Sequence, residues 1–320
     1  MSLRLTRPSE HRDAGVADAG SPESRRRAIR ARRLRRGALA FVLVGPAAIA
    51  YAVFVLRPMA PSFQWSFYQW NGVSESTWVG LDNYAAIFRN PEMLGSILNA
   101  FQLIFYFSVV PVILGLLTAN TIRGFATSRL ALVSRTVLFL PQIIPLVAAG
   151  IMWSWLYASN GLVNQVLELI GLGGITRAWL GDFDTALPAV GLIGAWVLFG
   201  LCMLLMLAGM TKIDPSLYEA ARIDGAGPFR EFFAITLPSL RQELSVCVTV
   251  TVIAARASVD IVYISTQGGP GNRTLVPGLE IYYLAFFQRE IGLASALAVA
   301  LMVLVLAVVL PIQRLTREGD

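Results

Sequence analysis

The sequence contains few charged residues. Only 14% of its 320 residues are Asp, Glu, Lys or Arg, whereas 56% are hydrophobic, and the mean hydropathy is +0.62. A soluble domain usually carries about 25% charged residues. The composition therefore indicates an integral membrane protein.

Lysine, histidine and cysteine are nearly absent. The single lysine, Lys212, is not part of a G-x-x-x-x-G-K-[ST] motif, which excludes a P-loop ATPase within this chain. The single histidine, His11, lies near the N-terminus, so the hydrophobic body cannot hold a Ser-His-Asp triad or a His/Cys metal site. Cys202 and Cys247 both lie in apolar segments, and we interpret them as small core residues and not as a disulfide or metal pair.

The charge that is present is unevenly distributed. Eleven arginines lie within residues 1–36, although the net charge of the whole chain is only +6. A basic tail can bind nucleic acid, but beside a membrane span it is better explained as a cytoplasmic anchor that follows the positive-inside rule. We expect 1–36 to be a partly disordered cytoplasmic tail and 37–320 to form the membrane domain.

Six apolar segments are long enough to cross a membrane. A helix of about 20 residues spans the hydrocarbon core of about 30 Å. The expected helices cover about 37–56, 97–120, 136–157, 187–210, 244–264 and 291–312. A cleaved signal peptide is the alternative for the first segment, but its apolar run would be shorter. Pro141 and Pro145 predict a kink near the start of the third helix.

The loop charges predict the orientation in the membrane. Six spans place both termini on one side, and the bases of the tail, of the 123–135 loop and of the C-terminus indicate that this side is cytoplasmic. The loop 158–185 has three acids and one base, which suits the outside. The aromatic loop 57–92 suits the outer membrane–water interface.

A mixed polar and apolar stretch separates the fourth and fifth predicted spans. Residues 219–238 read EAARIDGAGPFREFFAITLP. Asp214 and Pro215 suit the start of a helix, and Gly225 and Gly227 interrupt it. The pattern predicts a short helix, a tight turn and a second short helix on the cytoplasmic side.

This stretch resembles the EAA loop of permease subunits from binding-protein-dependent ATP-binding-cassette (ABC) importers. The matching elements are Glu-Ala-Ala at 219–221, Gly225, and Ile-x-Leu-Pro at 235–238. The resemblance implies an all-α integral membrane protein with six transmembrane helices, the type I ABC importer permease fold and a cytoplasmic helix-turn-helix coupling loop at 213–240. It also implies that the loop docks into a cleft on a separate ATPase. The implied coupling residues are Glu219, Ala220, Ala221, Asp224, Gly225 and Gly227.

A second stretch favours a sugar as the substrate. Residues 260–274 resemble the Gly-Gly-Pro segment of sugar permeases, and 78–88 resemble their first outer loop. The plain alternative for the Gly-Gly-Pro segment is a turn that ends the fifth helix. The chain lacks the glycine-rich C-terminal tail of the second permease in such pairs, so it is similar to the first, maltose-permease-like subunit of a heterodimer. The resemblance implies alternating access for a sugar or oligosaccharide.

The resemblance also implies a substrate pathway in the middle of the membrane. On the fifth helix the matching positions are Thr251, Ala254, Ala255 and Ser258, whose spacing puts them on one helical face. On the third helix they are Gln142 and Leu146. Small residues are also common where membrane helices simply pack together, which is the alternative.

Two ionisable residues fall within the fifth predicted span. Arg256 and Asp260 are four residues apart and so share a helical face. Charged groups at this depth usually pair with each other or face a cavity. We expect the two to act together, either as an ion pair that fixes the helix or as a gate or substrate contact.

The implied assembly has several partners. They are a second permease, two ATP-binding-cassette ATPase subunits that bind ATP and Mg, an extracytoplasmic solute-binding protein and the lipid membrane. The chain itself is expected to carry no cofactor or metal and to catalyse no chemistry. The alternatives are an importer of a glycerol-phosphate compound or a polyamine, and an ion-coupled secondary transporter, which would need inverted repeats or more intramembrane carboxylates.

Overall fold

The computed structural model describes residues 42–124, 128–256 and 258–317. The chain forms two compact units, residues 1–60 and 61–320. The Arg-rich tail expected at 1–36 lies outside the described residues. The first described helix was expected to end near residue 56 but continues to Trp65, through a π-helical turn at Ala52–Leu56 and then α2 (Arg57–Trp65). The π-helical turn shifts the hydrogen-bond register just before the prolines of α2.

Among the described residues, three unbroken helices are long and apolar enough to cross a membrane. They are Val42–Trp65, Pro91–Arg123 and α9 (Ala186–Met210). The second of them consists of α4 (Pro91–Ile104), the π-helical turn η2 (Phe105–Val109) and α5 (Val110–Arg123). It begins six residues before the expected 97 because Asn90 caps it, with its Oδ1 accepting a 2.8 Å hydrogen bond from the Glu92 backbone N–H.

Two further spans are bent. The third consists of α6 (Arg129–Phe139), a 3₁₀ turn η3 (Leu140–Ile143) and α7 (Leu146–Leu156), and the halves meet at 100°. The expected kink is therefore a complete break. Proline removes a backbone donor and disfavours the helical conformation in the residue before it, so the pair Pro141 and Pro145 ends one helix and starts another.

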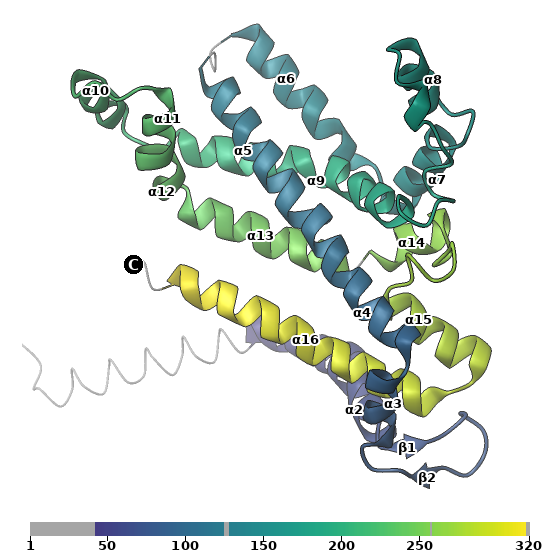
Figure 1. The fold of residues 1–320 in the computed structure, drawn as a ribbon. Helices are drawn as coiled ribbons and strands as arrows, with labels where there is room; N and C mark the ends of the chain where they lie inside the picture. Colours follow the sequence, from purple (N-terminus) through teal and green to yellow (C-terminus); the bar gives the residue numbers. More distant parts are fainter. Residues whose placement is uncertain (1–41, 125–127, 257, 318–320) are drawn as a thin grey trace, which may run out of the picture. The chain divides into compact units, whose positions relative to one another are not determined.

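The fifth span is also two helices. α13 (Arg241–Arg256) and α14 (Val259–Ser265) meet at 47°, with residue 257 outside the description. The last helix is α16 (Ile291–Arg317). In Figure 1 the C-terminal end of α16 lies on the same side of the second unit as α10–α12, and α7, α8 and α15 lie at the opposite end.

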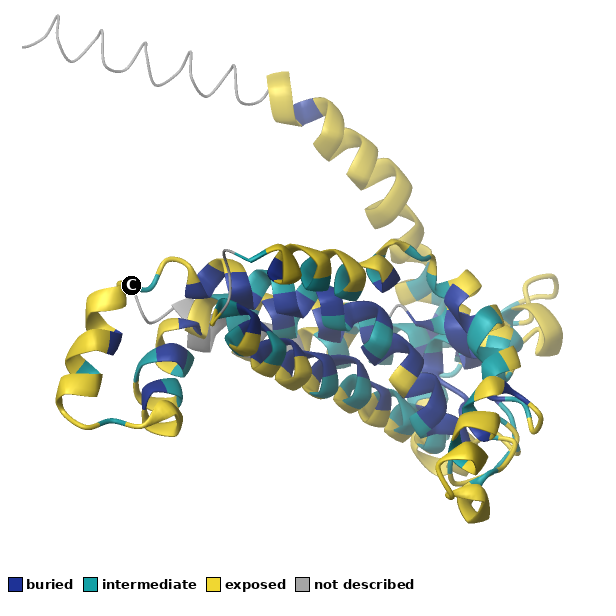
Figure 2. Cartoon of the chain, turned by 90° about the horizontal axis from the view of Figure 1, so that it is seen from above, coloured by how far each residue is buried: buried dark blue, intermediate teal, exposed yellow. Residues whose placement is uncertain are grey.

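The centre of the second unit is the contact of η2 and α5 with α9, which depends on glycine. A methyl group at Gly115 would lie 2.8 Å from the Met203 nitrogen and 2.9 Å from Cys202 Cβ, closer than a methyl group can approach. A methyl group at Gly194 would overlap the ring of Phe107. Two buried clusters fill the bundle on either side of these contacts, and Figure 2 shows buried positions along its middle. Cys202 and Cys247 are buried and free, as expected.

Short elements cover the end of the bundle away from α10–α12. A hairpin of β1 (Tyr68–Gln69) and β2 (Thr77–Trp78) is followed by α3 (Asp82–Arg89). The other elements are α8 (Leu162–Leu169), η4 (Gly173–Ile175), α15 (Pro277–Tyr283) and η6 (Leu284–Gln288).

Candidate coupling surface and substrate pathway

The expected coupling loop begins with a capped helix. α10 (Pro215–Ile223) starts after Asp214, whose Oδ1 accepts a 2.9 Å hydrogen bond from the Ser216 backbone N–H. This hydrogen bond lowers the pKa of Asp214 and keeps the cap ionised. A negative charge at this position also complements the helix dipole.

A left-handed glycine then turns the chain. Gly225 has a φ of +78°, which an L side chain rarely adopts, and its N–H donates a 3.0 Å hydrogen bond to the Arg222 carbonyl. Gly227 has an ordinary φ of −78° and precedes the second helix. That helix is continuous through α11 (Pro228–Glu231), η5 (Phe232–Thr236) and α12 (Leu237–Ser239). The stretch thus has the helix-turn-helix shape that its sequence predicts.

Side chains join the two helices to each other and to the bundle. Arg222 Nε lies 2.9 Å from Glu231 Oε1, and this contact raises the pKa of Arg222. The hydroxyls of Tyr218 and Thr236 share a buried hydrogen bond of 2.9 Å. The Arg123 guanidinium, at the end of α5, lies 4.1 Å from the centre of the Tyr218 ring. These contacts tie the two helices of the loop together and attach them to the end of α5.

A further ion pair closes the base of the loop. Lys212 Nζ, just after α9, lies 3.0 Å from Glu243 Oε1 in the first turn of α13. The Lys212 side chain is 74% exposed, so the pair contributes little free energy by itself. The pair nevertheless links Lys212, which immediately precedes the loop, to the first turn of α13, which follows the loop.

The proposed coupling residues lie mainly on the outside of this motif. Glu219, Ala220, Asp224, Gly225 and Gly227 are exposed, and Ala221 is half-buried. Sequence reasoning missed three larger exposed side chains beside them, Ile223 at 86%, Phe229 at 83% and Phe233 at 60%. Apolar side chains this exposed on a polar loop are typical of a protein interface. The sequence did contain a signal for them, since large apolar residues stand out in a polar loop that lies outside the membrane.

The expected substrate-pathway residues on the fifth span are mostly buried. Thr251 Oγ1 donates 2.7 Å to Ser108 Oγ on η2 or 2.8 Å to the Cys247 carbonyl, and the residue has no exposed surface. Ala255 and Ser258 are also buried, and Ala254 is half-buried. The prediction that these residues share one face of a single helix is wrong, because α13 ends at Arg256 and Ser258 precedes α14.

The two positions on the third span lie at its break. Gln142 is half-buried in η3, and its Oε1 is buried with no hydrogen-bond partner among the described residues. Leu146 is the first residue of α7 and packs against the buried cluster that contains Ala149 and Ile261. The break therefore presents an unpaired amide oxygen inside the bundle.

The expected pairing of Arg256 with Asp260 is not observed. Within the described residues no ion pair joins them, and Arg256 Nη2 instead donates a 3.2 Å hydrogen bond to the Leu301 carbonyl of α16. The bend between α13 and α14 removes the regular four-residue spacing that pairing requires. Arg256 Nε and Nη1 are buried without partners, whereas Asp260 is exposed.

One face of the fifth span has no cover within the second unit. Val246, Val250, Ile253, Tyr263 and Ile264 are all at least 38% exposed. Val246, Val250 and Ile253 follow helical spacing along α13, and Tyr263 and Ile264 share a face of α14 with Asp260. This face, and not the Thr251 face, is open to another helix or to a solute.

The Gly-Gly-Pro segment forms a compact turn fastened to α4. Gly268 and Gly271 have positive φ values of +89° and +51°. Asn99 Nδ2 donates to the Leu275 carbonyl at 2.9 Å, and Asn272 Nδ2 donates to Glu92 Oε1 at 3.1 Å. The turn thus ends the fifth span, as the plain interpretation of this segment expects, and ties it to the second.

Comparison with known proteins agrees with this geometry. A family model described as "binding-protein-dependent transport system inner membrane component" matches residues 111–315. A probable ABC transporter permease of Bacillus subtilis is 34% identical over 85% of this chain and 94% of its own length. A diacetylchitobiose uptake system permease of Streptomyces coelicolor is 34% identical over 88% of this chain and 83% of its own length.

Solved structures share the fold. A chain of a bacterial ABC transporter involved in the import of the acidic polysaccharide alginate superposes with a TM-score of 0.74 at 23% identity, covering 90% of this chain and 98% of that one. A second structure of the alginate transporter, in complex with an alginate pentasaccharide-bound periplasmic protein, gives 0.71 at 23% identity, over 90% and 96%. The type I importer permease fold is thus established. The chain belongs to the family of inner-membrane components of binding-protein-dependent transport systems, the permease subunits of ABC importers.

Proposed function

We propose that this permease imports a sugar or oligosaccharide by alternating access. The carrying observation is the internally tied helix-turn-helix at 213–240, which presents exposed apolar side chains at one end of the bundle. The diacetylchitobiose permease, similar over 88% of the chain, supports a saccharide substrate. ATP hydrolysis takes place on partner chains, and this subunit transmits the resulting motion.

The coupling surface is proposed to dock on an ATPase subunit. Ile223 and Phe229 are the anchors, since large apolar side chains at the centre of an interface carry most of the binding free energy. Glu219 offers a charge to a basic residue of the partner, and Ala220 allows close approach of the helix. The turn residues Asp224, Gly225 and Gly227 present the anchors at a fixed angle.

Other partners cover the remaining surfaces. A second permease meets the open face of α13 and α14, and the solute passes between the two subunits. The pathway side chains would be Asp260 and Arg256, supported by Gln142 at the break of the third span. The other predicted pathway residues support these side chains from within the bundle; they are Leu146, Thr251, Ala254, Ala255 and Ser258. A solute-binding protein delivers the saccharide to the opposite end from the coupling loop, and the alginate importer crystallised with such a protein supports this arrangement.

The orientation follows from the same proposal. The coupling loop faces the cytoplasm, and α16 ends on that side. Both termini are then cytoplasmic, and the hairpin, α8 and α15 face outward.

The test is transport by the complete importer in proteoliposomes. Permeases, ATPases and solute-binding protein should accumulate a labelled saccharide from a panel of neutral and acidic oligosaccharides, with ATP inside. Phe229→Ser should lower ATPase binding by about 30-fold, the effect of losing about 2 kcal/mol at an interface anchor. The control is Phe88→Ser on α3, which removes a similarly exposed ring at the other end of the bundle. Equal binding by the two variants would refute the coupling surface, and accumulation of no saccharide would refute the substrate class.

A further inference from the structure

An apolar cavity of about 310 Å³ lies where the fourth span begins. Its walls come from the first turns of α9, from the end of α7 at Tyr157, and from Val163 and Leu167 of α8. Its volume is at the lower end of the range for small-molecule pockets, about 300–1,000 Å³. The cavity is separate from the coupling loop and from the proposed pathway residues.

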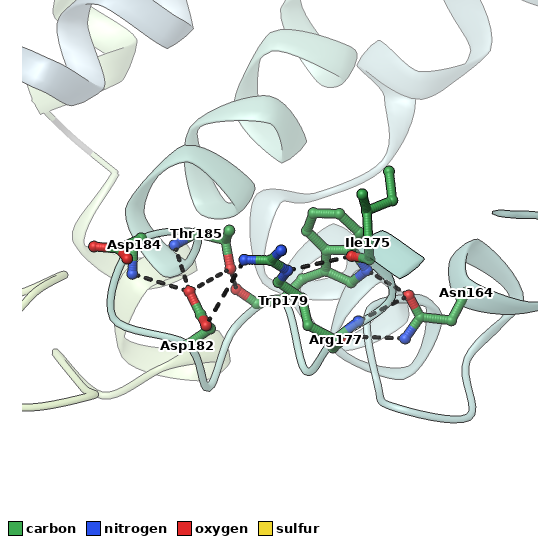
Figure 3. Close-up of polar contacts among 7 residues, drawn as sticks. All are labelled: Asn164, Ile175, Arg177, Trp179, Asp182, Asp184 and Thr185. Carbon is green, nitrogen blue, oxygen red and sulfur yellow. Dashed lines mark hydrogen bonds and ion pairs between the residues drawn. The ribbon is translucent and has the colours of Figure 1, made fainter. Parts of the chain in front are cut away.

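A hydrogen-bond network holds two polar side chains of the cavity wall, those of Trp179 and Thr185 (Figure 3). The Trp179 indole N–H donates to Asn164 Oδ1 at 2.8 Å, and the Thr185 hydroxyl donates to the Trp179 carbonyl at 2.9 Å. Asn164 is buried and also donates to the Arg177 carbonyl at 2.8 Å. The Trp179 indole and the Thr185 hydroxyl are thereby satisfied by the protein, and most of the cavity wall is apolar.

One cation stands at the edge of this cavity. Arg177 Nε donates to the carbonyl of Ile175, a wall residue, at 3.2 Å, and its guanidinium lies 5.8 Å from the ring of Trp179, another wall residue. Its contact with Asp182 is 3.9 Å long and about 40% exposed, so it is a weak pair. Asp182 is already held ionised, because backbone N–H donation from Asp184 lowers its pKa. The remaining guanidinium donors of Arg177 are available to an anion.

Apolar surface continues outward from the cavity. Leu192, in the second turn of α9, lines the cavity and is 45% exposed. Leu162, Val166 and Leu169 on the other side of α8 are 56%, 47% and 85% exposed. A helix with this pattern, beside the aromatic residues Tyr157 and Trp179 and at the end of two spans, is typical of the membrane interface.

We propose that this cavity binds one phospholipid of the adjacent membrane leaflet. An acyl chain fills the apolar cavity, and the phosphate lies at Arg177. At the end of a span, the lipid bilayer supplies acyl chains that can enter the cavity. The Arg177 cation at the rim complements the negatively charged phosphate of the same lipid. The bound lipid fastens α8 to the first turns of α9.

The first test counts lipid retained by the purified importer complex, using native mass spectrometry after extensive detergent washing. The parent should keep a phospholipid that Ala189→Phe loses, because the new ring fills the cavity. Arg177→Gln should retain a several-fold smaller fraction. The matched control is Ala148→Phe, which adds the same ring at an exposed position of α7 outside the cavity and should keep the lipid. Equal retention by Ala189→Phe and the parent would overturn the proposal.

The second test needs only the parent protein, so it stands even if Ala189→Phe fails to assemble. A phospholipid with a photoactivatable diazirine in its acyl chain is incorporated in nanodiscs and cross-linked, and the labelled peptides are identified. Labelling should concentrate at Leu167 and Leu192. Labelling that avoids the cavity overturns the proposal.

Discussion

At the scale of single residues, Glu280 makes the end of the bundle away from the coupling loop sensitive to pH. It lies on α15 and is only 6% exposed, and its Oε2 has no partner among the described residues. Burial raises the pKa of the Glu280 carboxyl, a hydrogen bond with Ser96 opposes this, and the charge of Glu92 adds to the increase. The folded protein therefore favours the neutral acid.

The sign of the pH effect follows from that shift. Glu280 contributes its full stability below the pKa of an unfolded carboxyl, about 4.3. This contribution is lost as the pH rises toward the higher folded-state pKa. Glu280→Gln keeps the shape and cannot ionise, so it should raise the Tm at neutral pH and flatten the Tm profile between about pH 4 and 8. The control, Glu290→Gln, changes an exposed acid and should follow the parent. A parent-like profile for Glu280→Gln would contradict the assignment.

Arg256 should matter for transport independently of Asp260. Its Nε and Nη1 are buried and have no partner in the described part of the chain, so they are suited to a group on another subunit or on the solute. A hydrogen bond to a charged group contributes about 1.5–3 kcal/mol, so Arg256→Gln should slow transport by about 10- to 100-fold while assembly is retained. Asp260→Asn should have little effect on assembly. The double exchange of Arg256→Asp with Asp260→Arg should not recover transport. Recovery of transport would indicate that the two residues form an ion pair, which the structure does not show. Transport assays and co-purification of the partner subunits distinguish these outcomes.

At the scale of elements, the turn of the coupling loop depends on Gly225. Proline fixes φ near −65° and has no N–H, so Gly225→Pro is incompatible with a φ of +78° and removes the hydrogen bond to Arg222. We expect the variant to insert in the membrane but to lose ATPase stimulation by the loaded solute-binding protein. Gly174→Ala is the control, since it lies outside the coupling loop, has no positive φ, and would place a methyl group with nothing within 4 Å. Normal stimulation in Gly225→Pro would exclude the loop from coupling.

Local sequence signals predicted elements better than they predicted geometry. Caps and glycines correctly placed the two coupling helices, because the turn depends on residues within the stretch itself. The prolines predicted a disturbance in the third span, but its 100° angle depends on where α7 packs. Arg256 and Asp260 have the spacing of an ion pair, yet the helix bends between them. A spacing argument assumes one continuous helix, whereas α13 and α14 meet at 47°.

The candidate site shows the same limit. The EAA pattern led to the prediction of Glu219 and Gly225 as coupling residues, but it did not indicate that Ile223 and Phe229 are the most exposed apolar side chains of the loop. Burial explains the difficulty on the fifth span as well. Thr251 and Ser258 are buried because the bundle packs on them. Helical spacing shows which residues share a face, but it does not show which face another helix covers.

At the scale of the whole molecule, the proposed orientation can be tested by thiol labelling. The two native cysteines have no exposed surface and can stay in place. Ser74→Cys on the hairpin loop should react with an impermeant maleimide added outside intact cells, whereas Ser128→Cys should react only after permeabilisation. Ser128 caps α6, so its loss costs about 1 kcal/mol, which a membrane protein of this size tolerates. The reverse labelling pattern would show that the proposed orientation is wrong.

The glycine contacts of η2 and α5 with α9 restrict how this sequence can vary. Gly115 and Gly194 sit where any added carbon meets backbone or a buried ring, so a saturation-mutagenesis survey should find almost no functional replacement at either position. Gly95 and Gly174 have nothing within 4 Å and ordinary φ values, so they should accept most small residues. Across future variants of this permease, the closest point between the two spans should therefore change least, while the lining of the solute path remains free to diverge.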